Sequence, residues 1–255
     1  MDGQEFSGRV IMVTGAASGL GRAAATRLAQ GGAALALADR DAAGLDTLTA
    51  DLKADILALP FDVGNEEAWP DAMARIAARW GRLDALVNAA GISHPRGPVE
   101  ALDTPTWCHV LNVNLEGSFL GCKHAVLAMR ETGGAIVNIA SILAEVADGG
   151  LPAYCASKGG VVQLTRSVAL HCGTRGYRIR CNAVSPGYID TPMNAAFDGT
   201  SPESRTRRTA MEALHPLGRF GTPGEIAELI CFLVGDGASF ATGAVFTADG
   251  GYTAA

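Results

Sequence analysis

The stretch Thr14-Gly-Ala-Ala-Ser-Gly-Leu-Gly21 decides the fold of this chain of 255 residues. It follows an apolar run at residues 9–14 and opens a helical pattern at residues 19–31. The apolar run predicts a buried strand, and the later spacing of apolar residues predicts a helix, so the glycines occupy the turn between them. This strand, turn and helix form the first half of a nucleotide-binding unit.

Each residue of the turn has a physical reason to be there. Gly15 permits the tight turn, Gly19 lets the backbone approach a phosphate, and Gly21 permits close packing of the helix on the strand. Ser18 and Leu20 lie beside the expected phosphate. Free N–H groups and the helix dipole favour negative charge at a helix N-terminus. We therefore expect the pyrophosphate of a dinucleotide at this turn.

Outward from the turn, the same rhythm of apolar run, turn and helical pattern repeats along the chain. Near-continuous apolar strands alternating with helices predict a parallel sheet covered on both faces, and right-handed crossovers make it doubly wound. We expect one α/β domain over residues 1–255, a Rossmann-like sheet of about seven strands with helices on both faces. The expected strands are 9–14, 34–39, 55–61, 83–88, 135–140, 178–184 and 244–248, and the expected helices are 19–31, 42–53, 66–80, 106–130, 152–173 and 225–235.

One insertion interrupts this rhythm. Residues 188–221 are polar, rich in Thr, Arg and Pro, and carry no strand pattern. A long insertion near the carboxyl ends of strands is typical of a lid or binding loop. Arg205, Arg207 and Arg208 within it could bind an anion, but a solvated helix face is the simpler interpretation.

Composition excludes several classes of protein. Hydrophobic residues make up 48% of the chain and charged residues 18%, a balance opposite to that of disordered proteins. The net charge of −6 argues against a nucleic-acid partner. Six scattered cysteines without a C-x-x-C pair predict reduced, mostly buried thiols and no metal. Residues 1–8 are polar and no apolar run spans a bilayer, so we expect a cytoplasmic protein without a membrane segment.

Carboxylates after the second and third strands suit the adenosine end of the cofactor. Asp39 stands 18 residues after Gly21, close to the spacing of a carboxylate that binds ribose hydroxyls. A carboxylate there would repel a 2′-phosphate, which favours NAD over NADP, although the adjacent Arg40 could turn toward such a phosphate. Asp62 could bind the adenine amino group or serve as a helix cap. Small residues in Asn88-Ala-Ala-Gly91 would let a cofactor lie flat, or form a plain turn.

Tyr154 and Lys158 form the central catalytic pattern, because positions i and i+4 share one face of a helix. A free tyrosine has a pKa of about 10, and a nearby ammonium lowers it. Gly159 and Gly160 follow directly and predict close packing of this helix. Ser141 ends the fifth strand, where its hydroxyl can hold a substrate oxygen or cap a turn.

These motifs occur in the order found in the short-chain dehydrogenase/reductase family, which the chain resembles over essentially its whole length. The resemblance implies that Tyr154 is the acid/base, that Lys158 lowers its pKa and binds ribose, and that Ser141 orients the substrate oxygen. It also implies that Asn114 supports a water that links Lys158 to solvent. The matching motifs are Thr14-Gly-x-x-x-Gly-x-Gly21, Asn88-Ala-Ala-Gly91, Asn114, Ser141, Tyr154-x-x-x-Lys158 and Pro186-Gly187.

The resemblance extends the cofactor site to the turn at residues 186–191. There it implies that the Ile189 backbone and the Thr191 hydroxyl bind the nicotinamide amide. Ala89 departs from the family, in which many members have a second asparagine. The expected cofactor contacts are Gly15, Ser18, Gly19, Leu20, Gly21, Asp39, Arg40, Asp62, Val63, Asn88, Ala89, Ala90, Gly91, Tyr154, Lys158, Pro186, Gly187, Ile189 and Thr191.

The residues expected around the reacting carbon are mostly apolar, which favours a hydrophobic alcohol or ketone, unless several of them only pack the lid. Glu145 and His94 could contact a polar substituent, but we expect them to be solvated. The expected substrate contacts are Ser141, Leu143, Val146, Tyr154, Tyr188, Met193 and Phe197, with Leu151 and Pro152 nearby.

Local stretches also resemble the bacterial 3β/17β-hydroxysteroid and cyclic-alcohol dehydrogenase branch. We therefore expect hydride transfer between NAD(H) and a cyclic or steroid-like secondary alcohol, in a homotetramer or homodimer built through the long helices and residues 243–252. Two alternatives stay open: a 3-oxoacyl thioester reductase that uses NADPH, and a catalytically silent dinucleotide-binding regulator. The stretches are Phe119-Leu-Gly-Cys-Lys123, Met129-Arg-Glu-Thr-Gly-Gly134, Gly176-Tyr-Arg-Ile-Arg180 and Thr191-Pro-Met193.

Overall fold

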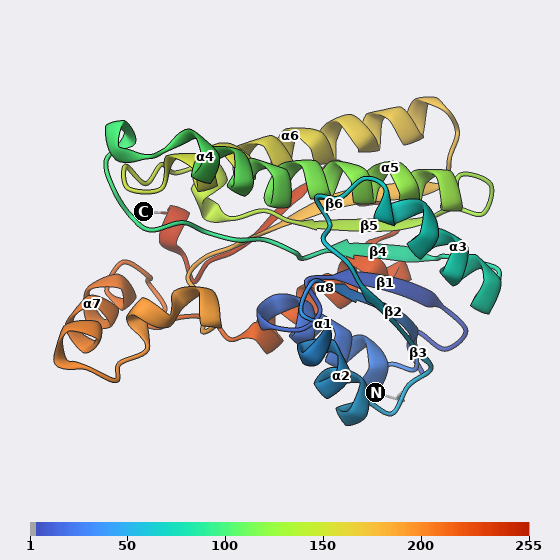
Figure 1. Ribbon diagram of the computed structural model, residues 1–255, viewed down its shortest axis with the longest axis horizontal. Coiled ribbons are helices and arrows are strands. Elements are labelled where there is room, and N and C mark those ends of the chain that lie inside the picture. Colours follow the sequence, from blue (N-terminus) through green and yellow to red (C-terminus); the bar gives the residue numbers. More distant parts are fainter. Residues whose placement is uncertain (1–3, 255) are drawn as a thin grey trace.

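A parallel sheet forms the centre of the molecule (Figure 1). The computed structural model describes residues 4–254, and within them seven strands lie in the order β3-β2-β1-β4-β5-β6-β7. The predicted doubly wound α/β fold is therefore confirmed. The strands are β1 (Val10–Thr14), β2 (Ala34–Asp39), β3 (Ile56–Pro60), β4 (Ala85–Asn88), β5 (Gly134–Ile139), β6 (Ile179–Pro186) and β7 (Val245–Ala248).

Strand β1 sets the position of the site. All five of its residues, Val-Ile-Met-Val-Thr, are buried, because it pairs with β2 on one side and β4 on the other and helices cover both faces. The chain winds from β1 toward β3 in one direction and then returns to β4 in the other. In open α/β sheets, ligands bind at the carboxyl ends of the strands where the order reverses in this way.

Helices cover the two faces of the sheet in two groups, which Figure 1 shows above and below the strands. One buried cluster includes Leu28, Leu37 and Ile230, and the other includes Trp69 and Leu86. Alternate residues of each strand supply the two clusters, so the strands carry apolar residues on both faces. The first group is α1 (Gly19–Gln30), α2 (Ala42–Asp51) and α8 (Pro223–Val234); the second is α3 (Ala68–Trp80), α4 (Thr104–Leu111), α5 (Gly117–Met129) and α6 (Pro152–Thr174).

The helix predicted over residues 106–130 is not continuous. It consists of α4 and α5 joined by a π-helical turn, η2 (Asn112–Glu116). Such wide turns frequently lie at functional sites, and this one carries Asn114. Short 3-10 turns complete the secondary structure: η1 (Val99–Ala101), η3 (Ile142–Ala144), η4 (Pro192–Phe197), η5 (Asp236–Ala238) and η6 (Tyr252–Ala254).

The insertion at residues 188–221 contains helical structure, of which the sequence analysis anticipated only a helix face at Arg205, Arg207 and Arg208. Besides η4 it holds α7 (Pro202–Glu212), whose N-cap Ser201 accepts a hydrogen bond from the Ser204 amide. A parallel bridge between Ile189 and Gly221 joins the two ends of the insertion. The insertion therefore projects from the strand ends on a fixed base, and α7 lies apart from the sheet in Figure 1.

Arg208 of α7 is not the solvated cation that the sequence suggested. Its guanidinium binds both carboxylate oxygens of Asp190, at 2.7 and 3.0 Å, and the Glu212 carboxylate at 2.7 Å. It also lies 4.7 Å from the centre of the Phe220 ring. These contacts hold α7 against the base of the insertion.

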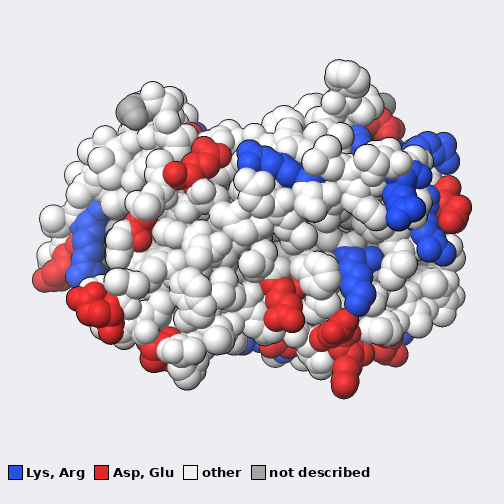
Figure 2. All heavy atoms as spheres, turned by 90° about the horizontal axis from the view of Figure 1, so that it is seen from above, with Lys and Arg blue, Asp and Glu red and all other residues white. Residues whose placement is uncertain are grey.

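Elsewhere, the face in Figure 2 mixes acidic and basic side chains around a largely uncharged middle, without the broad basic stripe of a nucleic-acid interface.

Candidate active site

The glycine-rich turn meets the strand end of β4. The Thr14 hydroxyl oxygen accepts hydrogen bonds from the Ala89 and Ala90 amides, at 3.1 and 3.2 Å. Gly15 has a φ of +66°, and a Cβ there would lie 2.7 Å from the Ala90 Cα. A Cβ on Gly21 would collide with the Gly15 carbonyl. Gly21 thus serves helix packing, as predicted, and does not itself line a cavity.

A cavity of about 250 Å³ lies at the end of this turn nearest β2 and β3. The Asp39 carboxylate lines it and accepts hydrogen bonds from the Ala17 and Asp41 amides, both at 3.0 Å. Asp39 therefore supports the glycine turn as well as facing the cavity. Asp62 lines the cavity too, and its carboxylate accepts the Gly64 amide at 2.9 Å, the contact of a local turn. The other expected residues that line it are Gly15, Ser18, Arg40, Val63, Ala90 and Gly91.

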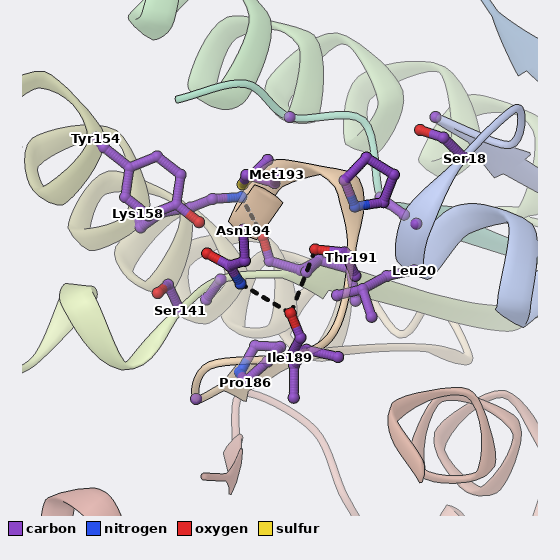
Figure 3. A pocket seen from close by; sticks show the side chains of 18 residues that line it. Ser18, Leu20, Ser141, Tyr154, Lys158, Pro186, Ile189, Thr191, Met193 and Asn194 are labelled. Carbon is purple, nitrogen blue, oxygen red and sulfur yellow. Dashed lines mark hydrogen bonds between the residues drawn. The ribbon is translucent and has the colours of Figure 1, made fainter. Parts of the chain in front are cut away.

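A second cavity, of about 150 Å³, continues from the first and shares Gly15, Ser18 and Gly91 with it. Residues from five separated segments of the chain line it, and Figure 3 shows side chains such as Ser18, Ser141 and Tyr154 converging there. The sequence predicted this convergence from the common edge of the parallel strands. The other expected residues that line it are Gly19, Leu20, Ala89, Ser141, Tyr154, Lys158, Pro186, Gly187, Ile189 and Thr191.

A third cavity, of about 280 Å³, opens on the far side of Ser141 and Tyr154. Its volume is close to the lower end of ligand pockets, roughly 300–1,000 Å³, and suits a compact substrate. Val146 and Pro152 do not line it. The Val146 amide donates to the Ile142 carbonyl at 2.9 Å, so Val146 lies one turn after Ile142, which does line the cavity. The substrate contact predicted for Val146 therefore has no support from this cavity and stays a prediction. The apolar residues that line the cavity are Ile142, Leu143, Leu151, Tyr188, Met193, Ala196 and Phe197.

Asn88 requires a correction. Its side chain is 3% exposed and lines none of the three cavities. The side-chain amide donates to the Asn138 side-chain oxygen at 2.8 Å and to the Ser118 carbonyl at 3.3 Å. Asn88 therefore joins β4 to β5 and α5 inside the core. It supports the cofactor groove only through the position of the strand.

Tyr154 and Lys158 occupy the first turns of α6, with Pro152 as the first helical residue. The Lys158 side chain is buried, its Nζ donates to the Ile139 carbonyl at 2.7 Å, and Nζ lies 5.7 Å from the Tyr154 ring centre. Ser141 lies beside this pair in Figure 3 and accepts the Leu143 amide at 3.1 Å. The predicted trio is therefore assembled, and Ser141 is also the turn cap that the sequence allowed.

Burial dominates the acid–base balance of this pair. It raises the pKa of Tyr154 to about 12, although a hydrogen bond with Ser141 acts in the opposite direction. Burial also lowers the pKa of Lys158 to about 8. Desolvation of the buried phenol is the dominant cause of the Tyr154 shift, and the lowering of its pKa by Lys158 stays a prediction.

Asn114 anchors the loop that follows β4. Its side-chain oxygen accepts the Ile92 amide at 2.8 Å, and its side-chain nitrogen donates to the Ile92 carbonyl at 2.9 Å and to the Ser157 hydroxyl at 3.0 Å. A side chain on Gly91 would lie 3.4 Å from Lys158 Nζ and 3.5 Å from the Asn114 oxygen. Asn114 therefore holds the loop close to Lys158, and the water that it is expected to bind stays a prediction.

The sequence missed Asn194. Its side-chain amide donates to the Ile189 carbonyl at 2.8 Å (Figure 3), and it lines both the second and third cavities. Its position three residues after Thr191, in the expected amide-binding turn, was the available signal.

Close packing was predicted for two glycines of α6: a Cβ on Gly160 would lie 2.8 Å from Leu115, but a Cβ on Gly159 would meet nothing closer than 3.9 Å.

The free cysteines are mostly buried, as predicted. Four of the six free cysteines are buried, Cys155 is partly buried and Cys108 is exposed. Within residues 4–254, no cluster of three or more His, Cys, Asp or Glu could hold a metal ion. Across the same residues, no helix has the length and apolarity needed to cross a membrane. A cytoplasmic location stays a prediction.

Comparison with known proteins identifies the family. A sequence model described as "Enoyl-(Acyl carrier protein) reductase" matches residues 15–253. The chain is 43% identical to cis-4-hydroxycyclohexanecarboxylate dehydrogenase of Sinomonas cyclohexanicum, over 99% of both chains. The chain belongs to the short-chain dehydrogenase/reductase family. The resemblance inferred from the motifs is therefore confirmed.

Two further relatives place this short-chain dehydrogenase/reductase more closely. It is 36% identical to 3-beta-hydroxysteroid dehydrogenase of Comamonas testosteroni, over 96% of this chain and 95% of the relative. A crystal structure of levodione reductase, 37% identical, superposes with a TM-score of 0.92 over 98% of this chain and 99% of the other. The enzyme is an oxidoreductase that acts on the CH–OH group of a small alcohol, or on its ketone, and binds a nicotinamide dinucleotide.

Proposed function

We propose that this short-chain dehydrogenase transfers hydride between NAD(H) and a hydrophobic cyclic secondary alcohol or its ketone. One observation carries the proposal: three connected cavities run from Asp39 to Phe197, with Ser141 and Tyr154 at the junction of the second and third. The third cavity is mostly apolar and suits a ring. The names of two relatives, a hydroxycyclohexanecarboxylate and a hydroxysteroid dehydrogenase, support a cyclic substrate.

The first two cavities fit a dinucleotide. Gly15 lines both cavities, and Gly19 and Ser18 present the N-terminus of α1 to the second. Asp39 offers a carboxylate to ribose hydroxyls, and Ile189 and Thr191 line the end nearest Tyr154. When bound, the nicotinamide supplies the carbon that accepts or donates the hydride.

In the proposed mechanism for oxidation, the Ser141 hydroxyl and the Tyr154 oxygen hold the substrate oxygen, and Tyr154, as the phenolate, takes the alcohol proton. Its phenolate needs stabilisation, because burial raises the pKa of Tyr154 to about 12. The Lys158 ammonium, 5.7 Å from the ring centre, is the cation that the chain provides for this purpose. Lys158 and Asn114 then lie on the route by which the proton leaves. Reduction follows the same path in reverse.

Asp39 favours NAD over NADP. Its carboxylate lines the first cavity, where we expect the adenosine ribose to bind, and its negative charge would repel the 2′-phosphate of NADP. This also disfavours the alternative of an NADPH-dependent 3-oxoacyl thioester reductase. Arg208, one of the lid arginines that could have received a carrier phosphate, is already bound by Asp190 and Glu212.

We also propose a homotetramer or homodimer. Several large apolar side chains are exposed on the long helices and near the C-terminus, where covering them would remove apolar surface from water. On the long helices they are Phe119, Leu127 and Leu170, and toward the C-terminus they are Phe232 and Phe240.

The decisive experiment compares the wild type with Tyr154→Phe. We expect the wild type to reduce NAD⁺ with cyclohexanols or small hydroxysteroids, followed by the absorbance of NADH. Tyr154→Phe should bind NADH as the wild type does but lose about 10²–10⁴-fold in kcat, the usual contribution of general acid–base catalysis. Full activity in the variant would remove Tyr154 from the mechanism. Tight NADH binding without turnover of any alcohol by the wild type would favour the silent regulator.

A further inference from the structure

A histidine with an unpartnered side-chain nitrogen lines the third cavity. Among the described residues, four buried side-chain polar atoms have no hydrogen-bond partner: Nε2 of His94, His124 and His215, and Oγ of Ser185. Of these four residues, His94 is the one that lines the third cavity, together with Ser141 and Tyr154. The sequence favoured a solvated His94, but its side chain is 9% exposed.

The backbone contact of His94 defines what the free nitrogen can do. Nδ1 lies 2.8 Å from the Pro95 carbonyl oxygen, which can only accept a hydrogen bond. Nδ1 must therefore carry the hydrogen, so Nε2 of the neutral ring has a free lone pair. A buried acceptor without a partner is unfavourable, and a hydroxyl on a ligand would satisfy it.

The segment that carries His94 is held in place. The Gly97 amide donates to the Gly150 carbonyl at 3.1 Å, and the Arg96 guanidinium binds both carboxylate oxygens of Asp148 at 2.7 Å. These contacts join the loop after β4 to the loop before α6. His94 thus has a fixed position relative to Tyr154, as a specificity residue requires.

Charge decides which polar group the cavity accepts. Arg96 is the charged residue among those that line the cavity, and Asp148 neutralises it. A carboxylate would find no free cation there and would meet the lone pair of His94. A hydroxyl would instead donate to that lone pair without bringing a charge into the apolar cavity.

We propose that His94 is a specificity-determining residue, which accepts a hydrogen bond from a second, neutral hydroxyl group on the substrate. The preferred substrates are then cyclic diols, or the corresponding hydroxyketones, with one hydroxyl at Ser141 and Tyr154 and the other at His94. This inference rests on the proposed oxidation of cyclic alcohols. It adds a substrate class that the apolar lining alone does not select.

The test compares cyclohexanol with 1,2-, 1,3- and 1,4-cyclohexanediols, using NAD⁺ and the full-length enzyme. After allowance for the two equivalent hydroxyls, we expect kcat/KM of the wild type to be about 10-fold or more higher for at least one diol. His94→Phe should abolish this preference, mainly by raising KM for the diol, because the contact lies away from the reacting carbon. The change in kcat/KM for cyclohexanol, which has no second hydroxyl for His94, should be smaller than the change for the diol.

Two variants serve as controls. His94→Gln keeps an acceptor and should retain part of the preference for the diol. His124→Phe removes another unpartnered Nε2, on α5 and stacked against Trp69 away from the cavity, and should keep the whole preference. NADH binding and a thermal unfolding midpoint close to that of the wild type show that each variant is folded.

Each remaining outcome has one meaning. Equal kcat/KM for cyclohexanol and all diols, or an undiminished preference in His94→Phe, overturns the role of His94 but leaves the oxidation of cyclic alcohols intact. A preference for 4-hydroxycyclohexanecarboxylate over every diol, unaffected by His94→Phe, overturns the assignment of a neutral group. If no ring alcohol is oxidised by enzyme that binds NADH, the proposed function fails and the inference fails with it.

Discussion

At the scale of single residues, Lys158 shows a conflict between stability and chemistry. Lys158 is 4% exposed, and the hydrogen-bond partner of its ammonium among the described residues is a neutral carbonyl, that of Ile139. Burial lowers the pKa of Lys158 to about 8, so the folded state disfavours the charged form. The charge beside Tyr154 is kept although it destabilises the fold.

We therefore expect Lys158→Met to stabilise the protein while it abolishes turnover. Below the folded pKa of about 8 the lysine is charged in both states, and the full penalty, about 1–3 kcal/mol, is present. As pH rises from about 8 to the unfolded pKa of 10.5, the folded state releases its proton first and the penalty disappears. Urea unfolding at about pH 7 and about pH 10 measures the difference. Lys123→Met, at an exposed lysine, is the control; a less stable Lys158→Met at neutral pH contradicts the argument.

Asp39 controls the choice of cofactor in a way that a conservative change can test. Asp39→Asn removes the charge but keeps an oxygen for the Ala17 amide, so the glycine turn should stay intact. We expect the ratio of NADPH to NADH affinity to rise about 10-fold or more, because repulsion of the 2′-phosphate is lost. Fluorescence titration with both dinucleotides measures it. Asp41→Asn, which lines the same cavity, should leave the ratio unchanged; equal shifts in both variants would assign the effect to general charge.

Single-residue roles were the least predictable part of the sequence. Asp39, Tyr154 and Lys158 were predicted because their spacing from a strand or along a helix fixes their position. Asn88 stands in a cofactor motif, but its contact with Asn138 on the neighbouring strand turns it into the core. No local pattern contains such a contact between side chains that are 50 residues apart.

At the scale of elements, the strands were predicted well because helices on both faces require continuous apolar runs. The bounds of helix α7 were not predicted, although a solvated helix face was, because most of its residues are polar and no apolar stripe marks it. Its signal was local: Ser201 followed by Pro202 is a typical helix start. The π-turn around Asn114 was also not predicted, since its width is visible only in the backbone.

The first strand–turn–helix element allows a sharp test. In Gly21→Ala, the new methyl group would collide with the Gly15 carbonyl, so the turn must open. We expect a loss of stability of about 1–3 kcal/mol and NADH binding weakened by at least about 10-fold. Gly173→Ala in α6 is the matched control, since a Cβ there meets nothing within 4 Å and alanine favours a helix. Unchanged NADH affinity in Gly21→Ala, measured by calorimetry, would show that the turn tolerates a side chain.

At the scale of the whole molecule, two exposed apolar surfaces require an explanation. One lies on α5 and α6, where Leu127 is 53% and Leu170 is 71% exposed, and the other surrounds the fully exposed Phe240. A monomer would leave both in water, whereas a tetramer with two kinds of interface would cover both. Covering these surfaces in the proposed assembly would remove apolar area from water and so stabilise the fold.

Leu170→Glu tests this assembly directly. A charge in a symmetric interface meets its own copy across the two-fold axis, so each substitution acts twice and leaves like charges without partners. We expect light scattering during size exclusion to show an oligomer for the wild type and half its mass or less for the variant, with a lower thermal midpoint. Leu214→Glu, at a 50% exposed residue beyond α7, should keep the wild-type mass. A monomeric wild type would leave both apolar surfaces without a partner copy and contradict the proposed oligomer.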